Sequence, residues 1–317
     1  MPLDRWEALD ALLAARIDGD TSAVAVAVTD RAGLLHASLH GWADRAARRP
    51  LGPADLFELG SAGKAWAAIC LLQLAEAGRI DLRAPVEAYL PWLALPAAEP
   101  ITFHHLLSHT AGLPEGPDGP SSRADALALA AQGPFAPGGD FAYSNIGYNL
   151  IGYALEDMLG ASYGAIVGER IFGPLGMADS LPATGAADRS RLAAAAAPFA
   201  PCDVASGCAA VTAPDLAAYV RLLLNEGATP GGRLLSDASF ALLARPVAPA
   251  WGGWYGYGLV SAALDGRRTL GHRGETAGFK SYALADLDAG LGAAVLVCGA
   301  AEPIELGEAA LRHAFDH

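Results

Sequence analysis

The sequence predicts an α+β protein in which both chain ends contribute strands to one antiparallel sheet, with a mostly helical segment inserted between them. Near the N-terminus, residues 22–30 (SAVAVAVTD) alternate Val with Ala, and residues 34–41 (LLHASLHG) resume after a short turn, as in a β-hairpin. Near the C-terminus, residues 257–300 contain short apolar runs separated by Asp-Gly and Ala-Gly turns. Strands at both ends of a chain usually pair when no second sheet is available, so we expect one sheet with helices packed on it.

Helical periodicity dominates the segment between these strands. The helical patterns cover residues 61–80, 102–110 and 145–160, and further helices are expected at residues 1–20 and 302–317. Clusters of Gly, Pro and Ala predict loops at residues 115–122, 135–140 and 191–201. These patterns predict a cleft where the helical segment meets the sheet.

We therefore divide the chain into two domains. The sheet domain is discontinuous and consists of residues 1–60 and 205–317. The helical domain consists of residues 61–204 and carries two of the sequence motifs described below.

The composition excludes several classes of protein. The chain has 317 residues, of which 53% are hydrophobic and 17% charged, and is long enough to bury a large core. Its formal net charge is -13 and its arginines are scattered, so we expect no nucleic-acid partner. Every apolar run is broken by a charge, Gly or Pro before ~18 residues, so no membrane span is expected. Residues 1–20 are amphipathic and unlike an apolar leader, which indicates a cytoplasmic protein.

The four cysteines, Cys70, Cys202, Cys208 and Cys298, form neither a C-x-x-C pair nor a dense disulfide pattern. This arrangement is typical of a reducing compartment. Cys202 and Cys208 could bridge a loop, but we expect both to be free thiols.

Ser61 and Lys64 are the first candidates for chemistry. If a helix begins at Ser61, the two side chains lie one turn apart on the same face, with Cβ atoms about 5–6 Å from each other. The lysine could then accept the proton of the serine hydroxyl, provided that a buried, electropositive setting lowers its pKa. The alternative is structural: Ser61 caps the helix and Lys64 extends along its first turn.

Ser162 is a rival nucleophile, because residues 160–164 (GASYG) match the G-x-S-x-G pattern of a nucleophile elbow. That elbow requires a strand directly before the serine. The preceding residues have a helical pattern, so we interpret the segment as a turn between two helices.

Two further segments have an alternative interpretation. His105 and His109 are four residues apart, but no third ligand and no H-E-x-x-H motif accompanies them, so we interpret both as structural histidines and expect no metal or cofactor. The aromatic segment 251–258 (WGGWYGYG) is typical of the entry to a strand, and it could alternatively contact a substrate near the cleft.

Two downstream triplets complete a recognisable set. Tyr143-Ser144-Asn145 and His272-Arg273-Gly274 follow Ser61 and Lys64 in the order Ser-x-x-Lys, Tyr-x-Asn, Lys/His-x-Gly. With these motifs the sequence resembles the beta-lactamase-related serine hydrolases: class C beta-lactamases, D-Ala-D-Ala carboxypeptidases, D-aminopeptidases and family VIII esterases. The resemblance is close over residues 57–180 and looser over residues 204–297, and it implies a beta-lactamase/transpeptidase-like fold.

The resemblance implies a role for each motif residue. Ser61 would be the acylated nucleophile, Lys64 its proton acceptor or relay, and Tyr143 the general base and acid. A phenol becomes a useful base only beside a cation, and Lys64 is the nearest candidate. Asn145 would hold the lysine and the substrate carbonyl.

The third motif would line the cleft from an edge strand. Gly274 would leave room for the substrate to approach the backbone, and the backbone N–H groups of Ser61 and Glu275 would form the oxyanion hole. His272 stands where lactam-hydrolysing relatives have a lysine, so the charge there would titrate near an unperturbed pKa of about 6.5.

The sequence thus predicts a metal-free serine hydrolase that acts through an acyl-enzyme on a small ester or amide. The weaker cation at His272 makes a carboxylate-bearing lactam a less favoured substrate. Beta-lactamase, D-amino-acid peptidase, an acyltransferase of natural-product assembly and a catalytically silent binding domain remain alternatives. The sequence does not fix the acyl group, its stereochemistry or the oligomeric state.

Overall fold

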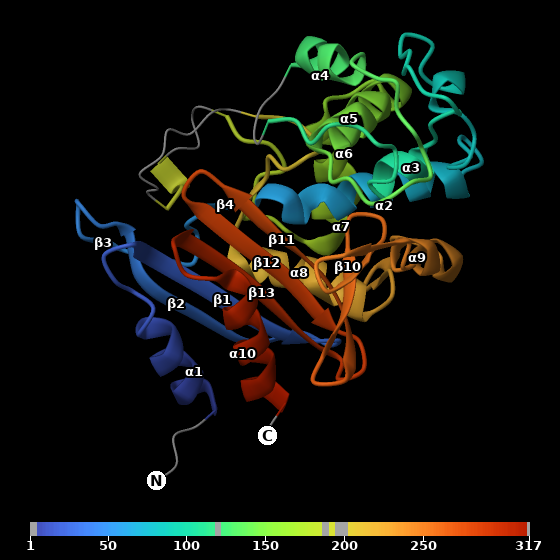
Figure 1. Cartoon of the computed structure of the whole chain (residues 1–317). Helices are drawn as coiled ribbons and strands as arrows, with labels where there is room; N and C mark the ends of the chain where they lie inside the picture. The colour runs from blue at the N-terminus through green and yellow to red at the C-terminus, as the bar shows by residue number, and fades with distance from the viewer. Residues whose placement is uncertain (1–4, 118–121, 186–189, 194–201, 316–317) are drawn as a thin grey trace.

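A computed structural model describes residues 5–117, 122–185, 190–193 and 202–315. Its central feature is an antiparallel sheet whose nine strands, among these described residues, come from both chain ends (Figure 1). The strand order is β3-β2-β1-β13-β12-β11-β10-β9-β8. The first strand and the last pair directly, with Val26 opposite Val295. The predicted fold class and the predicted hairpin are confirmed.

The sheet strands and the two terminal helices have these bounds: α1 Arg5–Ala14, β1 Thr21–Asp30, β2 Leu34–Asp44, β3 Arg49–Pro50, β8 Ala248–Ala250, β9 Gly253–Tyr255, β10 Val260–Leu264, β11 Arg267–Thr276, β12 Phe279–Asp286, β13 Leu291–Gly299 and α10 Pro303–Phe315. The remaining elements are β4 Phe57–Glu58, η1 Gly60–Gly63, α2 Lys64–Glu76, η2 Val86–Ala88, α3 Phe103–Leu107, α4 Arg123–Ala130, α5 Asn145–Leu159, α6 Tyr163–Val167, η3 Gly168–Phe172, α7 Gly173–Leu175, β5 Ala210–Val211, α8 Ala213–Leu224, β6 Ala228–Thr229, β7 Gly232–Arg233 and α9 Asp237–Leu243.

Strand β1 is buried on both faces, and its alternation of Val with Ala matches what covers each face. The valines Val24, Val26 and Val28 pack with residues of α1 and α10. The alanines of β1 point to the other face, where α8 packs against the sheet. Successive side chains of a strand point to opposite faces, so the small residue leaves room for α8 and the larger one fills the space under α1 and α10.

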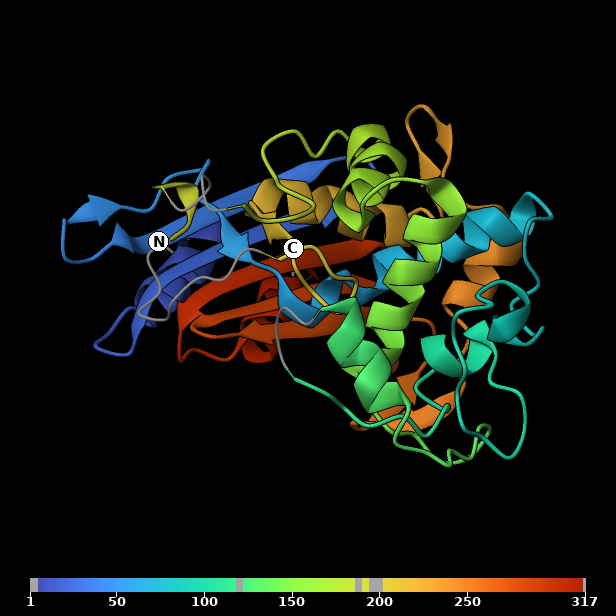
Figure 2. The same cartoon turned by 90° about the horizontal axis from the view of Figure 1, so that it is seen from above.

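The helical segment lies at one end of the sheet, as Figure 2 shows from above. Helix α2 is its buried axis: ten of its thirteen residues are buried, and they lie on every side of the helix. A helix that is apolar all round is a core helix. Its N-terminal turn, η1, packs against β11 and β12. The turn that carries Ser61, together with the start of α2 at Lys64, therefore meets the sheet. The domain boundaries at residues 60/61 and 204/205 stay a prediction.

The segment around Ser162 connects two helices, as predicted. Helix α5 ends at Gly160, which adopts a left-handed conformation with φ of 70°. The Ser162 hydroxyl then accepts a hydrogen bond from the Ala165 N–H and caps α6. No strand precedes this serine, since residues 145–159 are helical, so the geometry of a nucleophile elbow is absent here.

The prediction for two of the cysteines is wrong. Cys202 and Cys208 form a disulfide, with Cα atoms 5.4 Å apart, whereas Cys70 and Cys298 are free and buried. The loop between the first two folds back on itself and brings their Cα atoms within bonding range, which sequence spacing alone does not reveal. Of the predicted loops, 135–140 is irregular as expected, and most of 191–201 and the middle of 115–122 lie outside the described residues. Within the described ranges, no helix is long and apolar enough to cross a membrane.

Candidate active site

Ser61 lies in a short 3-10 turn and not in the α-helix itself. The turn η1 spans Gly60–Gly63, and α2 begins at Lys64, slightly later than the expected start at Ser61. The residues that cap the two elements are Leu59 and Gly63, and neither supplies a side-chain cap. The interpretation of Ser61 as a helix cap therefore fails. Its hydroxyl instead lies 2.9 Å from Lys64 Nζ.

Glycines let three backbone segments approach this turn directly. A Cβ on Gly60, whose φ is 58°, would lie 2.8 Å from the backbone N of Glu275 on β11. A Cβ on Gly207 would lie 2.5 Å from the carbonyl carbon of Gly60, and one on Gly258 would lie 2.5 Å from the backbone N of Ala65. Real Cβ atoms do not approach so closely, so each glycine is required for this packing. The backbone of Glu275 consequently lies against the residue that precedes Ser61.

The structure explains why residue 274 is a glycine, and this explanation differs from the predicted one. A Cβ at this position would lie 1.9 Å from the carbonyl oxygen of Leu59 and 2.5 Å from Ser281 Oγ. The Ser281 hydroxyl donates to that same carbonyl at 2.5 Å. The space left by Gly274 is thus occupied by the chain just before η1 and is not open for a substrate, contrary to the prediction from the sequence.

Lys64 is completely buried, and its Nζ lies within hydrogen-bonding distance of at least three oxygen atoms. Its partners are Ser61 Oγ at 2.9 Å, Asn145 Oδ1 at 2.7 Å and the carbonyl oxygen of Ser206 at 2.7 Å. An amide oxygen and a peptide carbonyl can only accept, so two of these bonds always run from the lysine. The bond to Ser61 can run in either direction. As an ammonium, Lys64 donates to the hydroxyl, and as a neutral amine it can accept the hydroxyl proton.

Helix α5 holds in place the two groups that accept hydrogen bonds from Lys64, the Asn145 side chain and the Ser206 carbonyl. Asn145 is its first residue, and Asn149 follows one turn later on the same face. The Asn149 side-chain oxygen accepts from the backbone N–H of Ser206 at 3.1 Å, so the peptide of Ser206 is tied to α5 next to Lys64. The disulfide Cys202–Cys208 closes the same loop. Sequence reasoning missed Ser206 because it acts through its carbonyl group, although the i, i+4 spacing of the two asparagines was a usable signal.

Tyr143 lies two residues before the start of α5, between Lys64 and a cluster of rings. Lys64 Nζ is 4.9 Å from the centroid of the Tyr143 ring. The centroid of His109 is 4.3 Å from that of Tyr143, and those of Trp251 and His272 are 5.3 and 6.4 Å away. The structure thus brings the residues of all three motifs to one place.

His109, Tyr255 and His272 form a buried chain of hydrogen bonds between the segment before α5 and strand β11. The Ser144 N–H donates to His109 Nδ1 at 3.0 Å, so the imidazole carries its proton on Nε2 and donates it to Tyr255 Oη at 3.2 Å. The Tyr255 hydroxyl donates to His272 Nε2 at 3.2 Å, and His272 Nδ1–H donates to the Arg273 carbonyl. With both imidazoles neutral, every donor in this chain has an acceptor.

Burial is the main reason why these imidazoles are neutral. It lowers the pKa of His272 to about 3, with the charge of Lys64 as the second cause. The same two causes, in the same order, hold the pKa of His109 well below its usual 6.5. Burial also raises the pKa of Tyr255, which remains a hydrogen-bond donor. The expectation that His272 titrates near 6.5 is therefore wrong, because its ring is only 2% exposed.

The third motif lies on an edge strand only in part. Strand β11 pairs with β12 along its length, but β10 pairs only with Arg267 to Gly271. From His272 onward, no described strand flanks β11 on that side, and this half faces η1. The predicted edge therefore begins at His272, where β10 ends.

His105, the other histidine predicted to be structural, and its neighbour His104 both have protein partners. His105 and Thr102 form a capping box at the start of α3. His104 Nδ1 lies 2.7 Å from the Tyr257 hydroxyl, and burial together with nearby Arg83 lowers the pKa of His104 to about 4. No group of three potential metal ligands occurs in the part of the chain that the structure describes.

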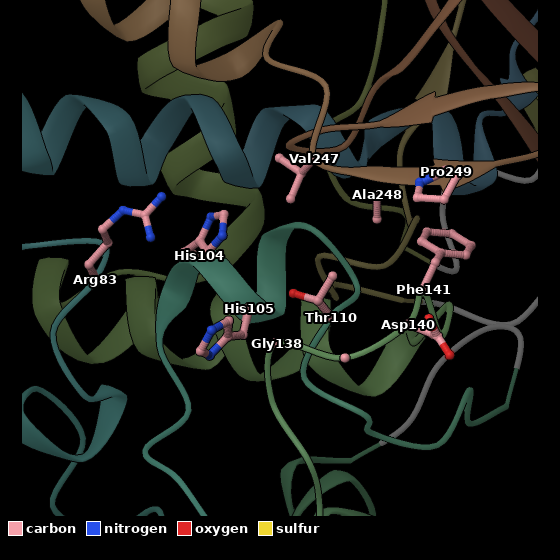
Figure 3. A pocket seen from close by; sticks show the side chains of 11 residues that line it. Arg83, His104, His105, Thr110, Gly138, Asp140, Phe141, Val247, Ala248 and Pro249 are labelled. Carbon is pink, nitrogen blue, oxygen red and sulfur yellow. The ribbon is translucent and has the colours of Figure 1, made fainter.

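An open pocket of about 450 Å³ is lined in part by Phe141, whose ring also contacts the rings of His109 and Tyr143 (Figure 3). Figure 3 places Arg83 and His104 at one end of this pocket and Asp140 and Phe141 at the other. The rest of its lining is His105, Thr110, Gly138, Gly139, Val247, Ala248 and Pro249. None of the predicted catalytic residues lines this pocket, and Phe141 connects it to the site through its ring contact with Tyr143 at 6.4 Å.

Comparison with known proteins agrees with this arrangement. The beta-lactamase family model matches residues 9–314. The chain is 29% identical to "Penicillin-binding protein 4" of Amycolatopsis lactamdurans, and the alignment covers 94% of this chain and 86% of that protein. It is 34% identical to "Esterase EstB" of Burkholderia gladioli, where the alignment covers 49% of this chain and 46% of that protein.

Solved structures share the fold along the whole chain. The octameric penicillin-binding protein homologue from Pyrococcus abyssi superposes with a TM-score of 0.84 at 23% identity, covering 100% of this chain and 78% of its own. D-amino acid amidase from Ochrobactrum anthropi SV3, complexed with L-phenylalanine amide, gives 0.80 at 21% identity and covers 99% of both chains. The resemblance drawn from the motifs is confirmed, and the chain belongs to the beta-lactamase family of serine hydrolases.

Proposed function

We propose that this protein hydrolyses a small ester or amide through an acyl-enzyme on Ser61, without a metal or cofactor. The observation that carries the proposal is the hydrogen-bond set of Lys64. Its bonds to Asn145 Oδ1 and to the Ser206 carbonyl are fixed in direction by acceptor-only partners, whereas its bond of 2.9 Å to Ser61 Oγ is free to reverse. A buried amine in this setting can remove the proton from Ser61 as its oxygen attacks.

The proposed reaction has two balanced steps. Ser61 Oγ bonds to the substrate carbonyl carbon, its proton passes to Lys64, and a proton delivered through Tyr143 leaves with the departing alcohol or amine. A water molecule then attacks the acyl carbon and gives its proton to the same groups. The bond to Ser61 Oγ breaks, and this oxygen takes back a proton, which releases the acid and restores the Ser61 hydroxyl. Tyr143 is the proposed carrier of this proton, and the centroid of its ring lies 4.9 Å from Lys64 Nζ.

The backbone N–H groups of Ser61 and Glu275 are the proposed oxyanion hole. Support comes from Gly60, which lacks a Cβ where the Glu275 backbone approaches within 2.8 Å of the position that a Cβ would occupy. Two such donors aimed at the developing negative oxygen are typically the largest single contribution to acyl-transfer catalysis. Asn145 Oδ1 accepts from Lys64, which supports its proposed part in holding the lysine.

A neutral substrate fits the charges around the site. His272 occupies the third-motif position, and burial holds its pKa near 3, so it supplies no positive charge at neutral pH. A carboxylate-bearing lactam would lack the cation that lysine-bearing relatives place there. Beta-lactamase and D-amino-acid peptidase activities, acyl transfer to an alcohol or amine, and a silent binding domain are the alternatives.

The compartment stays a prediction. The sequence indicates a cytoplasmic protein, whereas the Cys202–Cys208 disulfide is more typical of an oxidising environment.

Labelling with a fluorophosphonate, read by intact mass, tests the proposal. The natural protein and Ser162→Ala should each gain one adduct and hydrolyse a short-chain p-nitrophenyl ester, whereas Ser61→Ala should do neither. Labelling that persists in Ser61→Ala and is lost in Ser162→Ala would move the nucleophile and overturn the proposal. Absence of labelling in the natural protein would indicate the silent binding domain. Product analysis with and without an added alcohol distinguishes hydrolysis from acyl transfer.

A further inference from the structure

The turn between β8 and β9 contains a bulky residue in an unfavourable backbone conformation. Ala250 pairs with Gly253, so the connection is a two-residue loop of Trp251 and Gly252. Both have positive φ, 49° for Trp251 and 78° for Gly252, as a type I′ turn requires. Asn, Asp and Gly are the residues that tolerate the first position of this turn, whereas a bulky side chain there is a genuine outlier.

The next hairpin of the same sheet provides an internal comparison. Between β10 and β11 the two-residue loop is Asp265-Gly266, with φ values of 50° and 80° and Leu264 opposite Arg267. The φ angles of the two turns thus agree within about 2°, but this turn has the favoured Asp-Gly sequence. Turn formation therefore does not explain the tryptophan at position 251. Unfavourable conformations that persist in a fold tend to occur where a side chain serves a function.

Trp251 stands over the site with much of its surface open. Its ring centroid is 5.3 Å from that of Tyr143, 5.3 Å from that of Phe141 and 6.2 Å from that of His272. The residue is nevertheless 59% exposed, more than any other large hydrophobic residue among those that the structure describes. The inner contacts fix the orientation of the indole ring, and its outer surface remains accessible.

The exposed indole lies within reach of a substrate on Ser61. Successive distances of 2.9, 4.9 and 5.3 Å join Ser61 Oγ to Lys64 Nζ, Lys64 Nζ to the Tyr143 centroid, and that centroid to the indole, so the oxygen and the indole centroid are at most about 13 Å apart. An acyl group with a ring a few bonds from its carbonyl has dimensions of this order. Aromatic rings stack on one another with centroids about 4.5–7 Å apart.

We infer that Trp251 is a specificity-determining residue that stacks against an aromatic group of the substrate, and that the substrate is an aryl-bearing ester or amide. The inference rests on the proposed hydrolase function and narrows its substrate class. A fixed, flat and exposed apolar surface next to Tyr143 is suited to stacking with a planar ring, and it makes a smaller contact with a small alkyl group.

The test compares aryl and alkyl acyl groups in three variants. The substrates are the methyl esters and primary amides of phenylacetic acid and acetic acid. Trp251→Asn removes the indole and installs the favoured Asn-Gly turn, Trp251→Phe keeps an aromatic face in the same turn, and Trp254→Thr is the matched control. Trp254 is in the same hairpin and 49% exposed, but no ring contact joins it to the site within the described chain. Threonine suits its strand position.

The expected result is a selective loss. In Trp251→Asn the ratio of kcat/KM for phenylacetyl to acetyl substrates should fall about tenfold, the order of one aromatic stacking contact, with a melting temperature no lower than that of the natural protein. Trp251→Phe should retain most of the ratio, and Trp254→Thr all of it.

Two outcomes would overturn the inference while leaving the hydrolase intact. Equal loss on both acyl groups in Trp251→Asn would mean that the indole only shields Tyr143 from water. An equal change of the ratio in Trp254→Thr would mean that the whole hairpin, and not Trp251, sets the preference. Failure of the natural protein to hydrolyse any of the four substrates, with Ser61 unlabelled by a fluorophosphonate, would instead refute the proposed function, and the inference with it.

Discussion

Replacing His272 by glutamine should make the folded protein less sensitive to acid. Burial lowers the pKa of His272 from 6.5 to about 3 in the folded protein, so below pH 6.5 the unfolded chain binds a proton here that the folded chain does not. Stability therefore falls as the pH falls, and the loss continues until the pH approaches the folded pKa. Between pH 7.5 and 4.5 this one group should cost about 3 kcal/mol of unfolding free energy.

Urea unfolding followed by tryptophan fluorescence, at pH 7.5 and 4.5, measures this difference in the natural protein and in His272→Gln. The glutamine does not titrate, and its side-chain oxygen can still accept from Tyr255. Any constant cost of the substitution is the same at both pH values, so it cancels, as does the titration of other groups. The natural protein should lose about 3 kcal/mol more than the variant on acidification. Equal losses would show that His272 is protonated in the folded state and that the neutral chain of hydrogen bonds is wrong.

Further substitutions test other parts of the site. Tyr143→Phe should reduce the rate on the order of 10²–10⁴-fold with little change in substrate binding, and a loss below tenfold would remove Tyr143 from the proton path. Tyr255→Phe should lower the melting temperature more than Tyr257→Phe, because it leaves two buried imidazole partners unsatisfied instead of one, and the reverse order would contradict the chain. The double variant Cys202→Ser/Cys208→Ser should lose about 2 kcal/mol of stability, measured by urea unfolding, and unchanged stability would show that the bridge is dispensable. EDTA should leave activity intact, and loss with recovery on zinc would contradict a metal-free mechanism.

The sequence was sufficient for the architecture because its patterns are local. The Val-Ala alternation of residues 22–30 predicts a strand, and the order of turns near the C-terminus predicts the rest of the sheet. The unbroken apolar run of residues 23–28 is consistent with a strand buried on both faces, but it does not show that α8, from a distant part of the chain, covers one of them. The family resemblance, carried by three short motifs in order, supplied the topology that periodicity could not.

The contacts among the motif side chains were predicted, whereas two contacts of the backbone were missed. Ser61, Lys64 and Asn145 meet as expected, because their residue types are those that the family motif requires. The carbonyl of Ser206 and the close approach at Gly274 have no side-chain signature. The protonation state of His272 was wrong because burial, which the linear sequence does not show, decides the pKa of an imidazole more strongly than a neighbouring motif.

The chain through His109, Tyr255 and His272 positions the site and does not conduct protons through it. Its first donor is the backbone N–H of Ser144 and its last acceptor is the backbone carbonyl of Arg273. A peptide N–H cannot release its proton at neutral pH and a peptide carbonyl cannot hold one, so no net proton can enter or leave at these ends. The chain therefore fixes two tautomers and ties the segment that carries Tyr143 to the strand that carries Glu275. In the proposed mechanism the proton passes instead along the hydrogen bond between Lys64 and Ser61, which can reverse its direction.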